Sequence, residues 1–143
     1  TLIAIDKGSR LPFGFLQAYN WNLKDGWCFF QVHFEREQRG NDSCAEAGVA
    51  LLDYVFRNFD VRKIYMDVYD LNREVLGRAL TQAFVEEGRF GEHTWHQGQY
   101  RDLVRVALYR EEWPTVRGRV NFVLDVQAEA SELLDAPPRE NVE

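Results

Sequence analysis

The residues best suited to chemistry form a polar stretch that leads into a helix-start signal. The stretch runs from Arg36 to Cys44 and reads Arg-Glu-Gln-Arg-Gly-Asn-Asp-Ser-Cys. Ser43, followed three residues later by Glu46, has the pattern of a capping box. Such a start gathers exposed backbone N–H groups and the positive end of a helix dipole, which together can bind an anion. A capped surface helix without a ligand explains the same residues and is the commoner structure.

Two titratable residues, His33 and Glu35, lie directly before this loop. Residues 27–35 alternate, so Phe30, Val32 and Phe34 share one face of a strand and Gln31, His33 and Glu35 share the other. Both His33 and Glu35 are candidates for a general base, because each can take up a proton in a suitable environment. A structural role is the commoner alternative for a histidine on a strand.

The remaining histidines and cysteines do not predict a metal site or a disulfide framework. Cys28 and Cys44 are the two cysteines of the chain, and we expect both to be reduced thiols. His93 and His96 lack partner ligands at the spacing of a closed zinc site, so we expect ordinary loop residues there.

The elements that must position these residues follow from the pattern of apolar side chains. Leu2 to Asp6 and Phe13 to Asn20 predict a hairpin, and Trp27 to Glu35 predicts a third strand. A helix then runs to about Asn58, because apolar residues recur at helical spacing at Cys44, Ala47, Leu51, Tyr54 and Val55.

The second half of the chain repeats a strand and a helix before it closes with another strand. We predict a strand over Lys63 to Tyr69, a helix over Asn72 to Phe84 and a strand over Tyr100 to Arg110. This order implies a mixed sheet in an α/β (α+β) fold. We assign residues 1–113 to the core domain and residues 114–143 to an extension. The extension would hold a strand over 119–126, a short helix over 127–134 and a disordered acidic end.

Composition limits the class of protein and its partners. The 143 residues, 45% of them hydrophobic, fit one domain. The net charge of −6 comes largely from the tail after residue 126, and no basic run is present to bind nucleic acid. No apolar stretch is long enough for a membrane span, and no signal sequence is recognisable, so we expect a cytoplasmic protein that binds neither nucleic acid nor membranes.

Three segments at fixed spacing carry a family resemblance. They are Arg39 to Cys44 with the following Ala45-Glu46-Ala47, then Phe84-Val85-Glu86-Glu87-Gly88-Arg89, then Gly98-Gln99-Tyr100-Arg101-Asp102 with Glu111-Glu112-Trp113. Together they resemble the GNAT superfamily of N-acyltransferases, especially its branch similar to ribosomal-protein N-terminal acetyltransferases. The resemblance spans Leu2 to Trp113.

The resemblance implies a mostly antiparallel sheet with helices on both faces and a V-shaped split between two parallel central strands, where acyl-coenzyme A binds. Backbone groups of Phe34, Glu35 and Arg36 would pair with pantetheine, and Asn72 would reach it directly or through a water. The pyrophosphate would lie on N–H groups of Arg39, Gly40, Asn41, Asp42, Ser43 and Cys44. The implied activity is transfer of an acetyl group from acetyl-CoA, or of another acyl group, to a primary amine of a small molecule or a peptide N-terminus, without a metal.

Three departures from the family pattern keep a second interpretation open. Asp42 stands where the family has its first glycine, and its carboxylate would repel a pyrophosphate. Ala79 stands where many relatives have a tyrosine beside the leaving sulfur. The usual N-terminal strand and helices are not recognisable before the hairpin, which leaves an edge strand through which a homodimer can form. The alternative is therefore a degenerate GNAT fold that binds or supports a partner without turnover.

Overall fold

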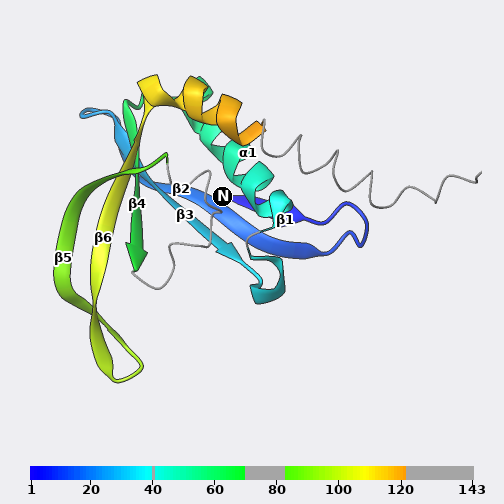
Figure 1. The fold of residues 1–143 in the computed structure, drawn as a ribbon. Coiled ribbons are helices and arrows are strands. Elements are labelled where there is room, and N and C mark those ends of the chain that lie inside the picture. Colours follow the sequence, from blue (N-terminus) through cyan, green and yellow to red (C-terminus); the bar gives the residue numbers. More distant parts are fainter. Residues whose placement is uncertain (40, 70–82, 122–143) are drawn as a thin grey trace, which may run out of the picture.

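The computed structural model describes residues 1–39, 41–69 and 83–121, and within them it forms a six-stranded sheet with helices packed on it (Figure 1). The strands, in the order β1-β2-β3-β4-β6-β5 across the sheet, are β1 (Leu2–Ile5), β2 (Pro12–Asn22), β3 (Trp27–Phe34), β4 (Lys63–Tyr69), β6 (Gln99–Tyr109) and β5 (Val85–His96). The helical elements are η1 (Arg36–Gln38), α1 (Asp42–Asn58) and η3 (Arg110–Glu112), and residues 113–121 are also helical. The predicted mixed α/β architecture is confirmed.

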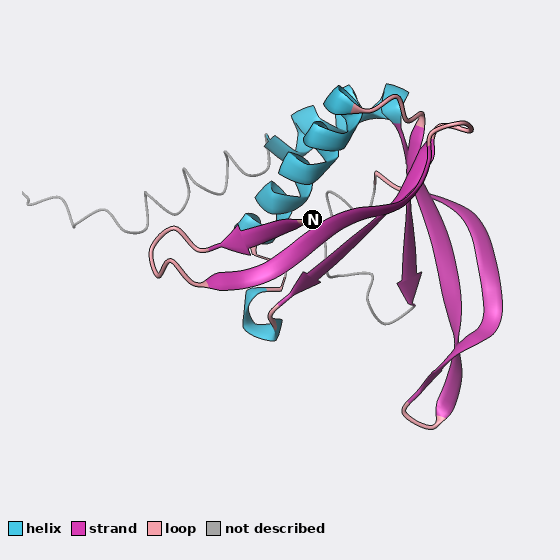
Figure 2. Ribbon diagram, turned by 180° about the vertical axis from the view of Figure 1, so that it is seen from behind, coloured by secondary structure: helices cyan, strands magenta, loops and turns pink. Residues whose placement is uncertain are grey.

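One pair of strands in this sheet is parallel. β3 and β4 run in the same direction, and every other neighbouring pair is antiparallel. Two parallel neighbours need a long crossover connection, and α1 supplies it between β3 and β4. Figure 2 shows that α1 crosses one face of the sheet, which we call the helix face. We call the opposite side the aromatic face, because β3 and β4 carry aromatic rings there.

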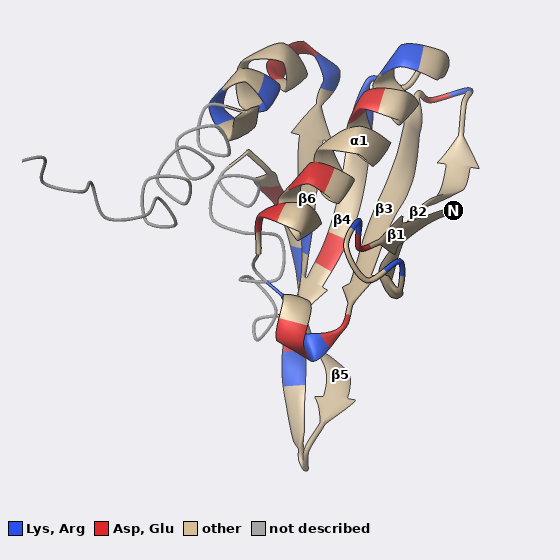
Figure 3. Cartoon of the chain, turned by 90° about the vertical axis from the view of Figure 1, so that its right-hand side faces the viewer, with Lys and Arg blue, Asp and Glu red and all other residues tan. Residues whose placement is uncertain are grey.

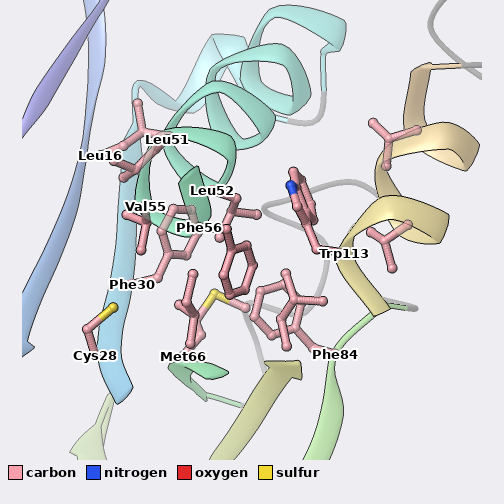
Figure 4. Packing of buried hydrophobic residues seen from close by; sticks show 14 of the residues in the cluster. Leu16, Cys28, Phe30, Leu51, Leu52, Val55, Phe56, Met66, Phe84 and Trp113 are labelled. Carbon is pink, nitrogen blue, oxygen red and sulfur yellow. The ribbon is translucent and has the colours of Figure 1, made fainter. Parts of the chain in front are cut away.

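The hydrophobic core lies between α1 and the helix face. Figure 4 shows Leu51, Leu52 and Val55 of α1 packing toward Phe30 of β3 and Met66 of β4. These side chains are at most 7% exposed. Burial of apolar area at about 25 cal/mol per Å² makes this layer the main source of stability.

The segment after β6 extends this core and corrects two predictions. Trp113, Val116 and Val120 are all buried at helical spacing, with exposed fractions of 5%, 6% and 1%. The strand predicted over residues 119–126 is therefore wrong at residues 119–121, which are helical, and residues 122–126 lie outside the described ranges. Because Val116 and Val120 belong to the core, the core also continues past the boundary predicted at residue 113.

Arg110, at the end of β6, fixes the end of α1 against the sheet. Its guanidinium donates hydrogen bonds to the carbonyl oxygens of Phe56 (2.6 Å) and Val61 (2.6 Å) and to that of Phe59. A cation stabilises the C-terminal end of a helix, where carbonyl groups lack helical partners. Trp113 adds a second link, because its indole N–H donates to Asp53 at 2.8 Å.

β5 was not predicted as a strand, and it places two histidines differently from expectation. His93 and His96 lie within β5 rather than in a loop. Nearly all of β5 is exposed, so it lacks the apolar alternation by which strands are recognised. Hydrogen bonding to β6 holds it instead, and the hairpin closes at Gln97 and Gly98, whose φ angles of 47° and 81° suit a tight two-residue turn.

The second predicted helix falls mainly on residues outside the described part of the chain. Of its range, Asn72 to Phe84, only residues 83 and 84 are described, and neither is helical. Phe84 is buried in the core at 9% exposure. No helix among the described residues is long and apolar enough to span a bilayer.

Candidate functional site

The central parallel strands separate along their length. β3 and β4 pair only at Trp27 with Lys63, Cys28 with Ile64 and Phe29 with Tyr65. Beyond Phe29, β3 stays paired with β2, whereas β4 stays paired with β6 up to Tyr69. The two arrows therefore point apart in Figure 1, which is the V-shaped split that the sequence resemblance implies.

The edge of β3 that faces this split carries backbone groups without a strand partner. The N–H of Glu35 donates to the carbonyl of Phe13 at 2.9 Å, which places the odd-numbered residues of β3 in the hydrogen-bonded pairs with β2. Alternate residues of a strand direct their backbone to opposite edges. Val32 and Phe34 therefore turn their N–H groups toward the split, beyond the last residue that pairs with β4.

All three residues expected to pair with pantetheine have engaged backbone groups, and the carbonyl of Arg36 accepts from the N–H of Arg39 at 3.4 Å. The carbonyl of Phe34 accepts from Nε of Arg39 at 3.1 Å, although its N–H stays available. Glu35 donates its N–H to Phe13 and accepts from the N–H of Gln38 at 3.0 Å. The available groups are thus those of Val32, which the sequence did not single out, and the N–H of Phe34.

A close approach between β2 and β3 sets the position of Phe34. A Cβ atom built on Gly14 would lie 2.4 Å from Cδ1 of Phe34 and 2.5 Å from the carbonyl oxygen of His33. Glycine is therefore required opposite Phe34, where the two strands pair. Phe34 itself is completely buried, so its backbone is held firmly beside the split.

The helix start after β3 is capped by Asn41 and not by Ser43, which corrects the predicted capping box. The Asn41 side chain accepts a hydrogen bond from the N–H of Cys44 at 3.1 Å. Helix α1 begins at Asp42, so Ser43 already lies in its first turn. Asn, Asp and Ser are all good N-caps, and three of them in a row do not reveal which one caps.

Several N–H groups of the proposed pyrophosphate loop are already used within the loop. Those of Arg39, Asn41 and Cys44 donate to backbone carbonyls of residues 36, 38 and 41. Among the described loop residues, the N–H groups of Asp42 and Ser43 remain for a ligand. Gly40 and Asn72, two other predicted cofactor contacts, lie outside the described residues, as does Ala79.

Asp42 is exposed in the first turn of α1. Figure 3 shows further bands of Asp and Glu along this helix. A carboxylate stabilises the positive end of a helix dipole, but the same charge opposes a second anion there. The helix start is therefore stable without a ligand, and a bound phosphate would have to overcome the electrostatic repulsion of the Asp42 carboxylate.

His33 and Glu35 are both exposed on the aromatic face, away from α1. The imidazole of His33 stacks on the ring of Phe15, with 5.5 Å between ring centroids. The described residues provide no hydrogen-bonding group that would orient this imidazole as a base. His33 and Glu35 thus lie on the same side of the split, but they do not form a catalytic pair with each other.

A cluster that the sequence did not predict lies on the aromatic face where the strands part. Its members are Tyr19, Phe29, Tyr65, Asp67 and Arg105, from four neighbouring strands, and we call it the arginine cluster. Arg105 donates from Nε and Nη2 to the two carboxylate oxygens of Asp67, each at 2.8 Å. Its guanidinium carbon lies 4.7 Å from the centre of the Phe29 ring and 5.8 Å from that of Tyr65.

The arginine cluster perturbs the acid–base behaviour of Tyr19. Burial, together with the negative charge of Asp67, raises the pKa of Tyr19 above its usual value. The bidentate hydrogen bonds to Asp67 raise the pKa of Arg105. At neutral pH the cluster therefore holds a protonated tyrosine and a fully formed ion pair.

A second ionic group joins β4, β5 and β6 at the end where β3 and β4 are paired. Lys63, which is 8% exposed, contacts the Glu87 carboxylate at 2.7 Å, and the hydroxyl of Tyr109 also donates to Glu87. Burial favours the neutral form of Glu87, but the hydrogen bonds from Lys63 and Tyr109 outweigh it and lower its pKa. Burial alone would lower the pKa of Lys63, but the hydrogen bond to Glu87 outweighs this effect and raises it.

Other features of the described residues offer less chemistry. Cys28 and Cys44 are both buried; the thiol of Cys44 donates to the carbonyl of Gln38 at 3.0 Å, and burial raises the pKa of Cys28 to about 11. No group of three or more metal-ligating side chains occurs in the described ranges. A cavity of about 390 Å³ between β2 and α1 is lined mainly by apolar side chains, including Trp21, Leu51 and Phe59.

Comparison with known proteins identifies the fold. No protein-family model matches the chain, and no curated protein matches it either. A mutant of spermidine N-acetyltransferase from Vibrio cholerae matches with a TM-score of 0.68 and 23% identity, over 78% of this chain and 65% of that chain. Mutant forms of the spermidine/spermine N-acetyltransferase from the same organism match with a TM-score of 0.68 and 23% identity, over 79% of this chain and 68% of that chain.

A third similar structure is the Vibrio cholerae spermidine N-acetyltransferase in complex with CoA and spermine. It matches with a TM-score of 0.65 and 24% identity, over 74% of this chain and 63% of that chain. The chain thus has a GNAT-type fold and spans about two thirds of the length of these proteins. The matches show this fold and do not single out the ribosomal-protein branch.

Proposed function

We propose that this chain is an N-acyltransferase that moves an acetyl group from acetyl-CoA, or another acyl group from its CoA thioester, to a primary amine. The acceptor is a small molecule or a peptide N-terminus. The observation that carries the proposal is the split between β3 and β4, along which Val32 and Phe34 present backbone groups without a strand partner. An extended ligand with amide groups, such as pantetheine, can pair with such an edge as an added strand does.

The reaction has simple requirements. The neutral amine attacks the carbonyl carbon of the thioester, a C–N bond forms and the C–S bond breaks. The nitrogen loses one proton to a base or a water chain, and the departing thiolate takes up a proton. His33 and Glu35 are the candidate bases, because both lie exposed on the face from which an acceptor would approach.

The loop before α1 provides the second contact for the donor. The N–H groups of Asp42 and Ser43, at the positive end of a 17-residue helix, would hold a phosphate oxygen. We extend this phosphate site to Arg39 and Asn41, whose side chains lie in the same turn, and to Gly40 and Cys44, as the family resemblance implies. Asn72 would reach the pantetheine instead, directly or through a water. The backbones of Glu35 and Arg36 would contribute only if the turn at η1 opened.

The matched proteins are described as acting on spermidine, and one of them was solved with spermine. On the aromatic face of this chain, Asp67 and Glu87 are each neutralised by an internal cation. We therefore do not propose a polyamine as the acceptor of this chain. We propose an amine that carries less positive charge than a polyamine.

A second candidate function is a non-catalytic GNAT fold that binds a partner. The charge of Asp42 and the internal hydrogen bonds of the loop favour it, because both weaken a pyrophosphate site. The two candidates differ in one measurable property, which is transfer of the acyl group.

The test is a coupled assay for free CoA thiol with acetyl-CoA and a panel of amines, together with calorimetric titration of acetyl-CoA. The panel contains spermidine, phenylalanine and a short peptide with a free N-terminus, and a reaction without acceptor measures hydrolysis. Amine-dependent thiol release supports the transferase. Binding of acetyl-CoA without release from any amine favours the non-catalytic fold, and absence of binding at millimolar ligand rejects the donor site.

We also propose that two copies of the chain associate through β1. This strand is one edge of the sheet and carries no charge, and its Ile3 and Ile5 are 66% and 55% exposed. The opposite edge, β5, bears several charged side chains, which protect an edge from pairing. Sedimentation should show a dimer that Ile3→Lys dissociates, and a wild-type monomer at high concentration would reject the proposal.

A further inference from the structure

We propose that Arg105 binds a carboxylate of the acceptor, so that the amine to be acylated belongs to an amino acid rather than to a simple amine or a polyamine. The inference rests on the proposed function and narrows its substrate class. It depends on three observations, which are the position of Arg105 over the split, its free hydrogen-bonding edge and the rings around it.

The position of Arg105 is unusual because its side chain reaches across a neighbouring strand. Arg105 belongs to β6, and β4 separates β6 from β3 in the sheet. Its guanidinium nevertheless lies 4.7 Å from the ring of Phe29, on β3. Phe29 is the last β3 residue that pairs with β4. The charge therefore lies over β4, on the aromatic face, at the point where the two strands begin to part.

The hydrogen bonds of Arg105 leave one edge of the guanidinium available. A guanidinium has two edges that can each hold a carboxylate through two parallel N–H groups. Asp67 occupies the edge formed by Nε and Nη2. The edge formed by Nη1 and the second N–H of Nη2 has no acceptor among the described residues. The side chain of Arg105 is 32% exposed, so a solute can reach this edge.

The surroundings favour a planar anion with an apolar side chain attached to it. The rings of Phe29, Tyr65 and Phe90 lie 4.7, 5.8 and 5.3 Å from the guanidinium carbon. Phe90 is 41% exposed and offers a surface to an apolar group. Rings packed around an arginine limit its motion and lower the cost of ordering it around a ligand. Asp67 sets the orientation of the guanidinium, although its charge reduces the attraction for a second carboxylate.

Arg105 is a specificity residue in this account and takes no part in the bond changes. The carboxylate of an amino acid held by Arg105 leaves its amine free to approach the split, where the thioester would lie. A simple amine would lose this contact and bind more weakly. A polyamine would meet the guanidinium with a charge of the same sign.

The experiment compares three acceptors that differ only at the carboxyl position. They are phenylalanine, phenylalaninamide and phenethylamine, each assayed with acetyl-CoA in wild type, Arg105→Gln and Arg105→Lys. The matched control is Arg57→Gln, because Arg57 is 65% exposed on α1 and, among the residues that the structure describes, is paired with Asp53 of the same helix. We expect kcat/KM of the wild type to be about tenfold higher for phenylalanine than for the amide, in line with a charge-assisted hydrogen-bonding pair.

Arg105→Gln should remove this preference by raising KM for phenylalanine, with kcat little changed. Arg105→Lys should retain only part of the preference. Arg57→Gln should keep it in full. Equal kcat/KM for the three acceptors in wild type would overturn the proposal while the transferase itself stands. A preference that persists in folded Arg105→Gln would overturn it as well.

Binding provides a readout that does not need turnover. N-acetylphenylalanine and N-acetylphenylalaninamide, the products of the two reactions, are titrated calorimetrically into each variant, and circular dichroism checks that the variant is folded. Tighter binding of the acid that is lost in Arg105→Gln supports the proposal even if no acceptor turns over. Equal binding of acid and amide, or binding of neither, rejects it. Acyl transfer to other amines in that case would leave the proposed function intact.

Discussion

The two faces of the sheet are built from the same strands but are stabilised in different ways. On the helix face, Phe30, Phe34 and Ile64 are at most 1% exposed and pack against α1 and residues 113–121. On the aromatic face, charged side chains lie among rings, and specific pairs such as Arg105 with Asp67 and Lys63 with Glu87 hold them. Apolar burial tolerates many sequences, whereas an ion pair between rings requires particular partners. We infer that the helix face specifies the fold and that the aromatic face carries the proposed selectivity for the acceptor.

The largest effect should come from the helix face. Phe30→Ala removes a ring that is 1% exposed and leaves a cavity, so we expect a loss of about 3–5 kcal/mol in the free energy of unfolding. Phe90→Ala is the matched change on the aromatic face, where the ring is 41% exposed, and it should cost about 1 kcal/mol or less. Urea denaturation measures both. Equal losses would contradict the division of roles between the faces.

The next effect concerns the ion pair of Lys63 and Glu87. Glu87→Gln leaves the buried ammonium of Lys63 without its counter-charge, which should cost about 3 kcal/mol. Its neighbour Glu86 is the control, because its ion pair with Arg89 is about 40% exposed and Glu86→Gln should change stability by about 0.5 kcal/mol or less. A Glu87→Gln variant as stable as wild type would show that this pair does not hold β4 to β5.

The same pair predicts how stability depends on pH. The pKa of Glu87 is lower in the folded chain than in the unfolded chain, so its contribution is complete above the unfolded pKa and is lost as pH falls through the folded pKa. The pKa of Lys63 is raised, so its contribution is lost as pH rises past the folded pKa. Between about pH 5 and 3, wild type should lose more stability than Glu87→Gln. Parallel curves for the two proteins would contradict the lowered pKa.

The smallest predicted effect tests the helix start beside the split. Asp42→Asn removes one negative charge from the first turn of α1 and should tighten acetyl-CoA binding about two- to fivefold. The same change should lower stability by roughly 0.5 kcal/mol, because the helix dipole loses a favourable charge. Glu46→Gln, one turn farther along α1, is the control. Unchanged affinity in Asp42→Asn would mean that no phosphate lies at this helix start.

The sequence predicted those elements whose local pattern reflects burial. The alternation at Trp27 to Glu35 and Lys63 to Tyr69 and the helical spacing from Cys44 to Val55 correspond to β3, β4 and α1. β5 escaped prediction because its exposed residues do not alternate. The helix at 113–121 was missed because Pro114 suggests a stop, although proline is well accepted in the first turn of a helix.

The site was less predictable than the fold for a different reason. His33 and Glu35 were accessible to sequence reasoning because they lie two positions apart at the end of one predicted strand; in the structure β3 ends at Phe34 and Glu35 directly follows it. The pairing of Asp67 with Arg105 joins residues 38 positions apart, and it depends on the register between β4 and β6. No local pattern fixes that register, so the arginine cluster could be found only in the folded chain.

The most direct test of the central claim, that an acyl-CoA pairs with the free edge of β3, is backbone amide hydrogen exchange by NMR with and without acetyl-CoA. Without ligand, the amide of His33 should be protected by its pairing with β2, whereas those of Val32 and Phe34 should exchange faster. With saturating acetyl-CoA, we predict slower exchange at Val32 or Phe34 and little change at His33. Unchanged exchange at both Val32 and Phe34 in the presence of millimolar acetyl-CoA would contradict the account.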